Sequence, residues 1–144
     1  MRQHNSPPTW PPLSTTFLRT ASGRSGLFTT PSFLPGGFYP APSFLAPAVD
    51  FVPRKGGVFI ADESQPGFVR PGETWWGFDR HGVIPDIVTV AKPMGNGLPV
   101  AAMAARDHVL RPFAVRVPYF NTYAGNPVSM AAAAAVLDVI EDEN

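Results

Sequence analysis

Two short apolar runs, each bounded by glycine, proline or acidic residues, indicate two buried strands. The run Gly57–Ala61 is continuously apolar and is followed by an acid. The run Ile87–Ala91 is apolar apart from one threonine and follows Pro85-Asp86. Apolar runs of about four to eight residues between turn signals are typical of strands covered on both faces, as in a parallel sheet. We therefore predict two strands of a mainly parallel sheet here.

A helical pattern precedes the first strand. Apolar residues recur at helical spacing within Ser43–Lys55, and the glycine pair Gly56-Gly57 supplies the stop. Pro47 is tolerated if it lies in the first turn, whereas Pro53 is expected to break the last turn. A helix next to a buried strand favours an α/β fold.

The clearest helical signal lies near the end of the sequence. Asn126 is a suitable N-cap, Pro127 suits the first helical position, and Ser129–Ile140 is rich in alanine. The acids Glu141–Glu143 then oppose the helix dipole, and no glycine stop follows. We therefore expect a helix that continues beyond this sequence, in a chain cut inside an element.

The N-terminal part has a different composition. The first 49 residues contain nine of the 18 prolines, no acidic residue and only three charged side chains. Residues 1–34 are therefore predicted to be an irregular Pro/Ser/Thr-rich tail, and residues 35–144 to be the folded part. An acid-free segment with Ser and Arg also suggests an organelle transit peptide, but the prolines disfavour the amphipathic helix that such peptides need. The predicted location is cytoplasmic.

Bulk composition excludes several classes of function. The formal net charge is zero, so we expect no nucleic-acid partner and no attraction to anionic membranes. No apolar run approaches the roughly 18 residues that span a bilayer. Cysteine is absent, which excludes disulfides and Cys-based zinc sites. His81 and His108 are scattered, and no metal site is expected.

An amine and an acid follow the two predicted strands. Lys92 comes directly after Ala91 and before the glycine-rich turn Pro93–Gly97, and the chain has only one other lysine, Lys55. Asp62 follows Gly57–Ala61 in the same way. Because the carboxyl ends of parallel strands share one edge of a sheet, both groups should lie at a common site. Such a site suits a cofactor that needs both an amine and an acid.

Three motifs extend this pattern over about ninety residues. They are Gly57-Val-Phe-Ile-Ala-Asp-Glu-Ser-Gln-Pro-Gly-Phe68, Pro85-Asp-Ile-Val-Thr-Val-Ala-Lys-Pro-Met-Gly-Asn-Gly-Leu-Pro99 and Asn121-Thr-Tyr-Ala-Gly-Asn-Pro127. In this order they strongly resemble the motifs of the class III pyridoxal-phosphate-dependent aminotransferases. The resemblance implies a partial large domain of the fold type I transferases, truncated at both ends.

The resemblance also implies roles for five residues. Lys92 would form a Schiff base with pyridoxal phosphate and then carry the proton between substrate and cofactor. Asp62 would pair with the protonated pyridine nitrogen, and Gln65 would hydrogen-bond the ring's phenolic oxygen. Ser64 replaces a valine that stacks on the ring. Thr122 would contact the phosphate of the neighbouring subunit's cofactor, which implies a homodimer.

The implied reaction is transfer of an amino group from a small-molecule amine or amino acid to a 2-oxo acid or aldehyde. Two alternatives stay open. A phospho-lyase of the same fold uses the same lysine but eliminates phosphate from a phosphorylated amino alcohol. A truncated, non-catalytic chain would be unable to bind the cofactor alone.

The segment between the first two motifs carries further expectations. Residues 64–82 are predicted to be a long loop packed down by aromatic side chains, and Glu63 and Arg70 are predicted to form a structural ion pair. Val69 replaces a glycine of the family pattern. If this position has a positive φ, a β-branched residue there is strained. Farther along, Asp107 is predicted to cap a short helix, and Phe113–Tyr119 is predicted to be a loop with packed aromatic side chains.

Overall fold

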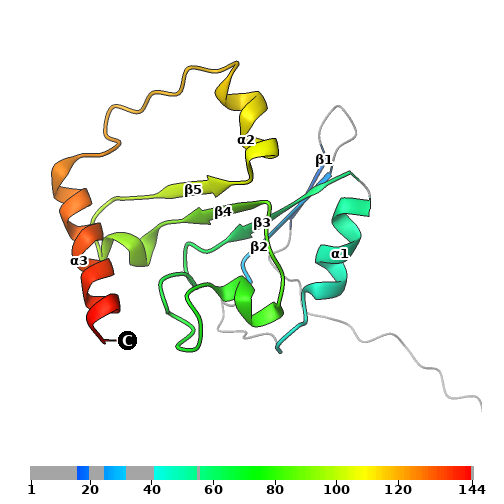
Figure 1. The fold of residues 1–144 in the computed structure, drawn as a ribbon, viewed down its shortest axis with the longest axis horizontal. Helices are drawn as coiled ribbons and strands as arrows, with labels where there is room; N and C mark the ends of the chain where they lie inside the picture. The colour runs from blue at the N-terminus through cyan, green and yellow to red at the C-terminus, as the bar shows by residue number, and fades with distance from the viewer. Residues whose placement is uncertain (1–15, 20–24, 32–40, 55, 144) are drawn as a thin grey trace, which may run out of the picture.

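The computed structural model describes residues 16–19, 25–31, 41–54 and 56–143. Its centre is one five-stranded sheet with the order β1-β2-β3-β4-β5 (Figure 1). The strands are β1 Thr16–Arg19, β2 Ser25–Thr29, β3 Val58–Asp62, β4 Ile87–Val90 and β5 Ala102–Ala105. The three central strands are parallel, and an antiparallel strand lies at each edge. The predicted α/β fold with a parallel sheet is confirmed.

Among the described residues there are three helices and two short 3-10 helices. They are α1 Ala46–Arg54, η1 Gly77–His81, η2 Lys92–Gly95, α2 Asp107–Ala114 and α3 Pro127–Glu143. Of these, α1, η1 and η2 connect strands, whereas α2 and α3 follow β5. Helix α1 packs on β2 and β3, whereas α3 lies at the other end of the sheet beside η2 (Figure 1). In the described part of the chain, no helix is both long and apolar enough to cross a membrane.

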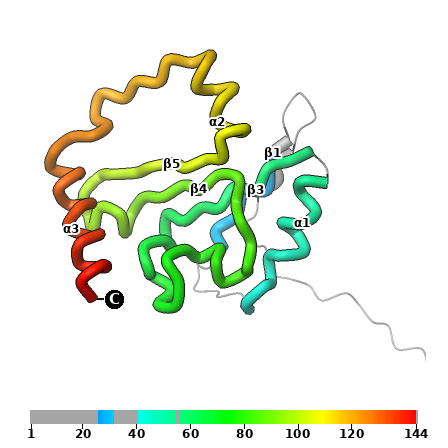
Figure 2. The backbone as a smooth tube through the Cα atoms, viewed as in Figure 1, coloured from blue at the N-terminus to red at the C-terminus, as the bar shows by residue number. Residues whose placement is uncertain are grey.

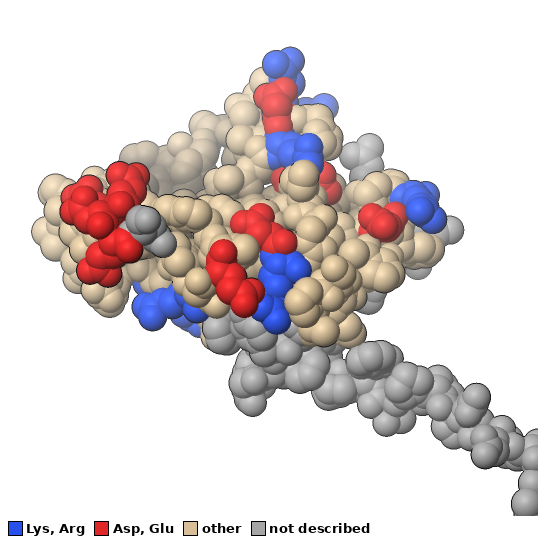
Figure 3. Space-filling view, turned by 60° about the horizontal axis from the view of Figure 1, so that its bottom comes forward, with Lys and Arg blue, Asp and Glu red and all other residues tan. Residues whose placement is uncertain are grey.

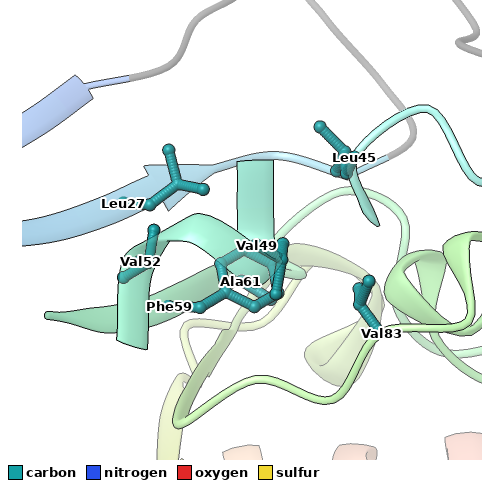
Figure 4. Packing of buried hydrophobic residues seen from close by; sticks show 7 residues of the cluster. All are labelled: Leu27, Leu45, Val49, Val52, Phe59, Ala61 and Val83. Carbon is teal, nitrogen blue, oxygen red and sulfur yellow. The ribbon is translucent and has the colours of Figure 1, made fainter. Parts of the chain in front are cut away.

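The main hydrophobic core lies between α1 and the first parallel pair. Leu27 of β2 and Phe59 and Ala61 of β3 point toward Val49 and Val52 of α1 (Figure 4). Pro47 lies in the first turn of α1, as predicted, and the helix ends one residue after Pro53. Strand β4 is less covered than the sequence predicted, because all four of its side chains are only partly buried.

Strands β1 and β2 correct the prediction that residues 1–34 form an irregular tail. Leu27 is buried in the core, and Ser25–Thr29 pairs with the following strand β3 in parallel. The prediction averaged proline content over the whole segment, whereas residues 13–30 contain no proline at all. Both strands lie inside this proline-free window. Thr30 and Pro31 are also described, and the other residues of the predicted tail lie outside the described residues.

The predicted N-cap of α3 is confirmed, whereas the predicted N-cap of α2 is wrong. The Asn126 side chain accepts a hydrogen bond of 2.9 Å from the Ser129 N–H, which confirms the predicted cap of α3. In α2 the N-cap is Arg106, and Asp107 is already the first helical residue. The capping role predicted for Asp107 is therefore wrong by one position.

Residues 64–82 form the predicted long loop between β3 and β4. Its aromatic side chains pack on one another: Trp76 stacks on Phe78 with 6.2 Å between ring centroids, and Phe68 meets Trp76 edge to face at 5.7 Å. His81 is buried at the end of η1, and its Nε2 donates a hydrogen bond of 2.7 Å to the carbonyl oxygen of Pro31. This bond ties the connection to the segment after β2.

Residues 115–126 run in a wide arc from the end of α2 back to the start of α3 (Figure 2). The aromatic residues of this arc are exposed, with 73% of Tyr119, 83% of Phe120 and 81% of Tyr123 accessible. The prediction that Phe113–Tyr119 packs its aromatic side chains is therefore wrong. Phe113 itself belongs to α2 and is also exposed.

Candidate active site

The carboxyl ends of β3 and β4 lie side by side and carry the predicted acid and amine. In the parallel pairing of the two strands, Asp62 is opposite Thr89. Lys92 follows Thr89 by three residues and opens η2. The backbone N–H of Glu63 donates a hydrogen bond of 2.8 Å to the carbonyl oxygen of Thr89, which holds the two strand ends together. Strand ends of this kind are the usual ligand sites of open α/β sheets.

One oxygen of the Asp62 carboxylate is fixed by two donors. Its Oδ1 accepts 3.1 Å hydrogen bonds from the Ser64 N–H and from the Thr89 hydroxyl. Within the residues that the structure describes, Oδ2 has no hydrogen-bond partner. The side chain is half-buried. Asp62 therefore presents an oriented carboxylate with one oxygen still able to accept a hydrogen bond.

Lys92 and Gln65 border the same hollow. Both side chains are exposed, and they share a depression of about 310 Å³ with Arg70, Asn96 and the turn around them. No carboxylate lines this hollow among the described residues, so its two cations face an opening without a negative partner there. The hollow is chemically suited to an anionic or electrophilic small molecule.

The turn after Lys92 depends on a close backbone approach. A side chain at Gly95 would place its Cβ only 2.5 Å from Cγ1 of Val100. Asn96 and Gly97 then both have positive φ, at 43° and 101°. Asparagine and glycine are the residues that adopt this backbone region most readily. The glycine-rich sequence after Lys92 thus shapes the wall of the hollow.

Two of the five predicted site residues, Gln65 and Lys92, line one hollow, whereas Asp62 and Ser64 are hydrogen-bonded to each other at the end of β3 and do not line it. Asp62, Ser64, Gln65 and Lys92 all lie at the ends of β3 and β4. Ser64 takes part through its backbone N–H, which bonds Asp62. Thr122 lies in the exposed arc 115–126 and does not line the Lys92 hollow. Its predicted role across a subunit boundary stays a prediction.

The sequence analysis missed Thr89 as a hydrogen-bond donor to Asp62 and assigned the wrong partner to Glu63. Thr89 is the only polar residue in the run Ile87–Ala91, and that isolated hydroxyl was the available signal. Glu63 is fully buried and accepts hydrogen bonds from the backbone N–H groups of Gly77 at 2.8 Å and Phe78 at 3.0 Å. The ion pair predicted with Arg70 is wrong, because Arg70 is exposed beside Lys92.

Burial is the main cause of a raised pKa at the Glu63 carboxyl. Desolvation raises the pKa of the Glu63 carboxyl to about 7. The two backbone hydrogen bonds act against this rise, whereas the nearby carboxylates of Asp79 and Asp62 add to it. The residue that follows Asp62 in the sequence is therefore a buried acid with a pKa near neutral pH, bound to the start of η1.

The loop after Gln65 contains the strained position that the sequence predicted. Val69 has φ 60°, in the left-handed region that β-branched residues rarely adopt. Phe68 has φ 61° as well. The substitution of a glycine by Val69 in the family pattern thus falls where glycine is the least strained residue.

Comparison with known proteins supports one family. The family model described as Aminotransferase class-III matches residues 28–144. The human protein named alanine–glyoxylate aminotransferase 2, mitochondrial, is 48% identical over 101 residues, which are 70% of this chain and 20% of that protein. The chain thus spans about a fifth of the length of this curated relative.

Solved structures agree with this match. A phospholyase from Arthrobacter in complex with phosphoethanolamine has a TM-score of 0.77 and 40% identity, over 85% of this chain and 29% of that one. An S-selective transaminase from Arthrobacter sp. with alanine bound has a TM-score of 0.75 and 32% identity, over 83% of this chain and 26% of that one.

The same comparison overturns one expectation. The human relative carries the word mitochondrial in its name. The cytoplasmic location predicted from composition is therefore wrong. Zero net charge and the absence of cysteine are compatible with several compartments, so they could not distinguish among them.

Proposed function

Because this chain belongs to the class III aminotransferases, we propose that it carries the lysine-bearing part of a pyridoxal-phosphate site. The proposed reaction is transfer of an amino group from an amine or amino acid to a 2-oxo acid or aldehyde. One observation carries this proposal. The parallel register of β3 and β4 places the Asp62 carboxylate at the strand ends from which Lys92 and Gln65 reach one hollow.

The residues present fit the cofactor that this family implies. An exposed primary amine, an oriented carboxylate with a free oxygen and an amide lie at one edge of the sheet. When bound, pyridoxal phosphate supplies a cationic ring that withdraws electrons from the substrate carbon. Asp62 Oδ2 would be the acceptor for a protonated ring nitrogen, because Oδ1 already accepts hydrogen bonds from Ser64 and Thr89.

The other residues hold, orient and move protons. Lys92 Nζ would hold the cofactor covalently and would later be the base that moves a proton to and from the substrate carbon. Gln65 borders the hollow from the loop after β3 and would donate a hydrogen bond to a ring oxygen. Ser64 lies in the turn after β3 and holds the Asp62 carboxylate through its backbone N–H.

Thr122 completes the proposal only in a homodimer. The arc 115–126 is exposed, and its aromatic residues Tyr119, Phe120 and Tyr123 are among the most exposed of the large hydrophobic side chains described. Large exposed apolar surfaces of this kind favour contact with another protein surface. We place Thr122 at the phosphate of the partner's cofactor, across such a contact.

A phospho-lyase activity is the second candidate. The phospholyase of known structure is 40% identical to this chain, more than the 32% of the transaminase. Elimination of phosphate uses the same amine and acid, so Lys92 and Asp62 serve either reaction. The two differ in the product that a single turnover releases.

A product assay tests the proposal. The chain is loaded with pyridoxal phosphate and given either L-alanine or phosphoethanolamine. We expect one pyruvate per chain from L-alanine and no inorganic phosphate from phosphoethanolamine. Release of phosphate would favour the lyase, and no product in either arm would favour a non-catalytic chain. Lys92→Ala is the control, since it should abolish either product.

We also propose a mitochondrial location for the protein, by analogy with the named human relative. A fluorescent fusion of the protein in cells should coincide with a mitochondrial stain. Diffuse cytosolic fluorescence would contradict this proposal.

A further inference from the structure

Arg70 is a second cation in the hollow that Lys92 borders. Apart from these two residues, the side chains around the hollow include the amides of Gln65 and Asn96, and no acidic residue of the described chain lines it. Neither Arg70 nor Lys92 forms an ion pair with a described residue. Two cations and two amide donors around one opening are complementary to a small anion.

The acid closest to Arg70 in the sequence is bound to another cation. Loop 64–76, which is the segment Ser64–Trp76, contains one acidic residue, Glu73. The Glu73 carboxylate forms an ion pair of 3.0 Å with Arg80 in η1. The loop that carries Arg70 therefore does not supply a counter-ion for its guanidinium group.

The backbone directly before Arg70 has an uncommon conformation. Phe68 and Val69 have φ of 61° and 60°, in the left-handed region that residues other than glycine seldom adopt. The Val69 N–H donates a hydrogen bond of 3.3 Å to the carbonyl oxygen of Trp75, and the carbonyl oxygen of Val69 accepts the Gly72 N–H at 2.8 Å. Strained backbone that its surroundings hold in place is concentrated at functional sites. Here it fixes the turn that presents Arg70.

Arg70 also borders a second hollow, of about 520 Å³, against α3. Among the described residues that line this second hollow, Arg70 is the only charged one, and most of the others are apolar. A long cationic side chain lays its carbon stem on apolar surface and keeps its charged end in a polar environment. We therefore expect the stem of Arg70 on the side of α3 and its guanidinium on the side of Lys92.

We propose that Arg70 makes the Lys92 amine selective for carbonyl compounds that carry a carboxylate beside the carbonyl group, which are the 2-oxo acids. Lys92 Nζ attacks the carbonyl carbon, a C=N bond forms, and the carbonyl oxygen leaves as water with two protons of the amine. The Arg70 guanidinium binds the carboxylate through charge-assisted hydrogen bonds. Because both cations border one hollow of about 310 Å³, the anionic group has to lie close to the reacting carbon.

This selectivity deepens the proposed transamination, and its biological meaning rests on that function. The same contact would favour 2-oxo acids over neutral aldehydes as acceptors of the amino group. The preference of the amine itself is a separate property of Arg70 and Lys92, and it can be measured without a cofactor.

Reductive trapping of the full chain tests the proposal. The chain is incubated with pyruvate, or with its neutral isostere pyruvamide, and cyanoborohydride reduces the imine to a stable secondary amine. Mass spectrometry of the digested chain gives the label on Lys92 relative to Lys55. The pyruvate preference is this ratio with pyruvate divided by the same ratio with pyruvamide. We expect Arg70→Met to lower the preference by about fivefold, which is the upper end for an exposed ion pair.

Three controls show whether the effect belongs to Arg70. Arg116→Met removes an exposed arginine that does not line the hollow and should leave the preference unchanged. Arg70→Lys keeps a cation and should retain most of the preference. Labelling of Lys92 by pyruvamide should be equal in all variants, because an intact hollow leaves the amine equally accessible.

An unchanged pyruvate preference in Arg70→Met, or an equal loss in Arg116→Met, would overturn the proposal. Because no pyridoxal phosphate is present in this experiment, failure of the proposed transaminase activity would leave its outcome unaffected.

Discussion

The hydroxyl of Thr89 donates a hydrogen bond of 3.1 Å to Oδ1 of Asp62, across the parallel pair β4 and β3. The bond orients the carboxylate at the end of one strand from a side chain on the next. The Ser64 N–H occupies the same oxygen at the same distance. Asp62 is therefore positioned by the register of the sheet as well as by its own loop.

Replacing Thr89 by valine removes this bond while keeping the β-branched shape. We expect Thr89→Val to lower the free energy of unfolding by about 1 kcal/mol, because a half-buried carboxylate loses one of two donors. Urea denaturation measures the change. Thr89→Ser retains a hydroxyl and is the control. An equal loss in both variants would mean that packing, and not the hydrogen bond, matters at this position.

Val69 offers a stabilising substitution. Its φ of 60° is unfavourable for a side chain that is branched at Cβ. Val69→Gly should raise the free energy of unfolding by about 1 kcal/mol, which is the usual cost of left-handed backbone for an L-residue. Thermal unfolding measures the effect. The control Val115→Gly lies at φ −87° and should bring no gain. A loss of stability in Val69→Gly would show that side-chain contacts outweigh the backbone strain.

Gly95 in η2 should tolerate no side chain while Val100 is present. The new Cβ of Gly95→Ala would lie 2.5 Å from Val100 Cγ1, and we expect a destabilisation of about 1–3 kcal/mol from overpacking. Val100→Ala removes the clashing methyl group. In a double-mutant cycle, the Gly95→Ala penalty should shrink strongly in the Val100→Ala background. Additive effects would contradict the close approach seen here.

The buried acid Glu63 predicts how stability depends on pH. Its folded pKa of about 7 lies above the ordinary glutamate value, so folding favours the protonated carboxyl. The stabilising contribution is complete at acidic pH and is lost as the pH rises toward 7. About 3 kcal/mol should disappear over this range, since one pKa unit corresponds to about 1.4 kcal/mol. The measurement is the difference in unfolding free energy between wild type and Glu63→Gln from pH 4.5 to 7.5.

That difference isolates Glu63 because the other titrating groups are common to both proteins. His81 and the surface acids change the stability of each protein in the same way, so their contributions cancel. The difference should fall steadily as pH rises and become constant above pH 7. A difference that stays constant across the range would show that Glu63 is ionised at all these pH values.

The elements that sequence analysis predicted well are those with local causes. The cap at Asn126 and the proline at position 127 define the start of α3 without reference to other parts of the chain. The apolar run of β3 and the glycines after α1 are equally local. The motifs put Asp62 and Lys92 after two strands that pair in parallel, and parallel strands share their carboxyl edge. The roles of Asp62, Ser64, Gln65 and Lys92 toward a cofactor stay predictions.

The elements that it missed depend on distant partners. Strand β2 is a strand because Leu27 packs under α1 and pairs with β3, about thirty residues away, and not because of a strong local pattern. The Thr89–Asp62 bond depends on strand register. Glu63 found backbone donors at 77 and 78 because loop 64–76 folds back, a path that no local signal indicates.

Negative charge gathers at the C-terminal end of α3, where the sequence placed acids that oppose the helix dipole. The acids at the end of α3, which are Asp138 and Glu141–Glu143, form a negative patch on the surface (Figure 3). No basic residue lies in the last turn of this helix. The patch is at the far end of α3 from its capped start at Asn126, so α3 is stabilised at one end and opposed at the other.

Covalent labelling tests the central claim most directly. The full chain is incubated with pyridoxal phosphate, reduced with borohydride and digested, and the labelled lysines are identified by mass spectrometry. The chain contains two lysines, so Lys55 serves as the internal reference for Lys92. The account predicts that Lys92 carries most of the label and that Asp62→Asn reduces this preference. Equal labelling of Lys55 and Lys92, unchanged in Asp62→Asn, would contradict it.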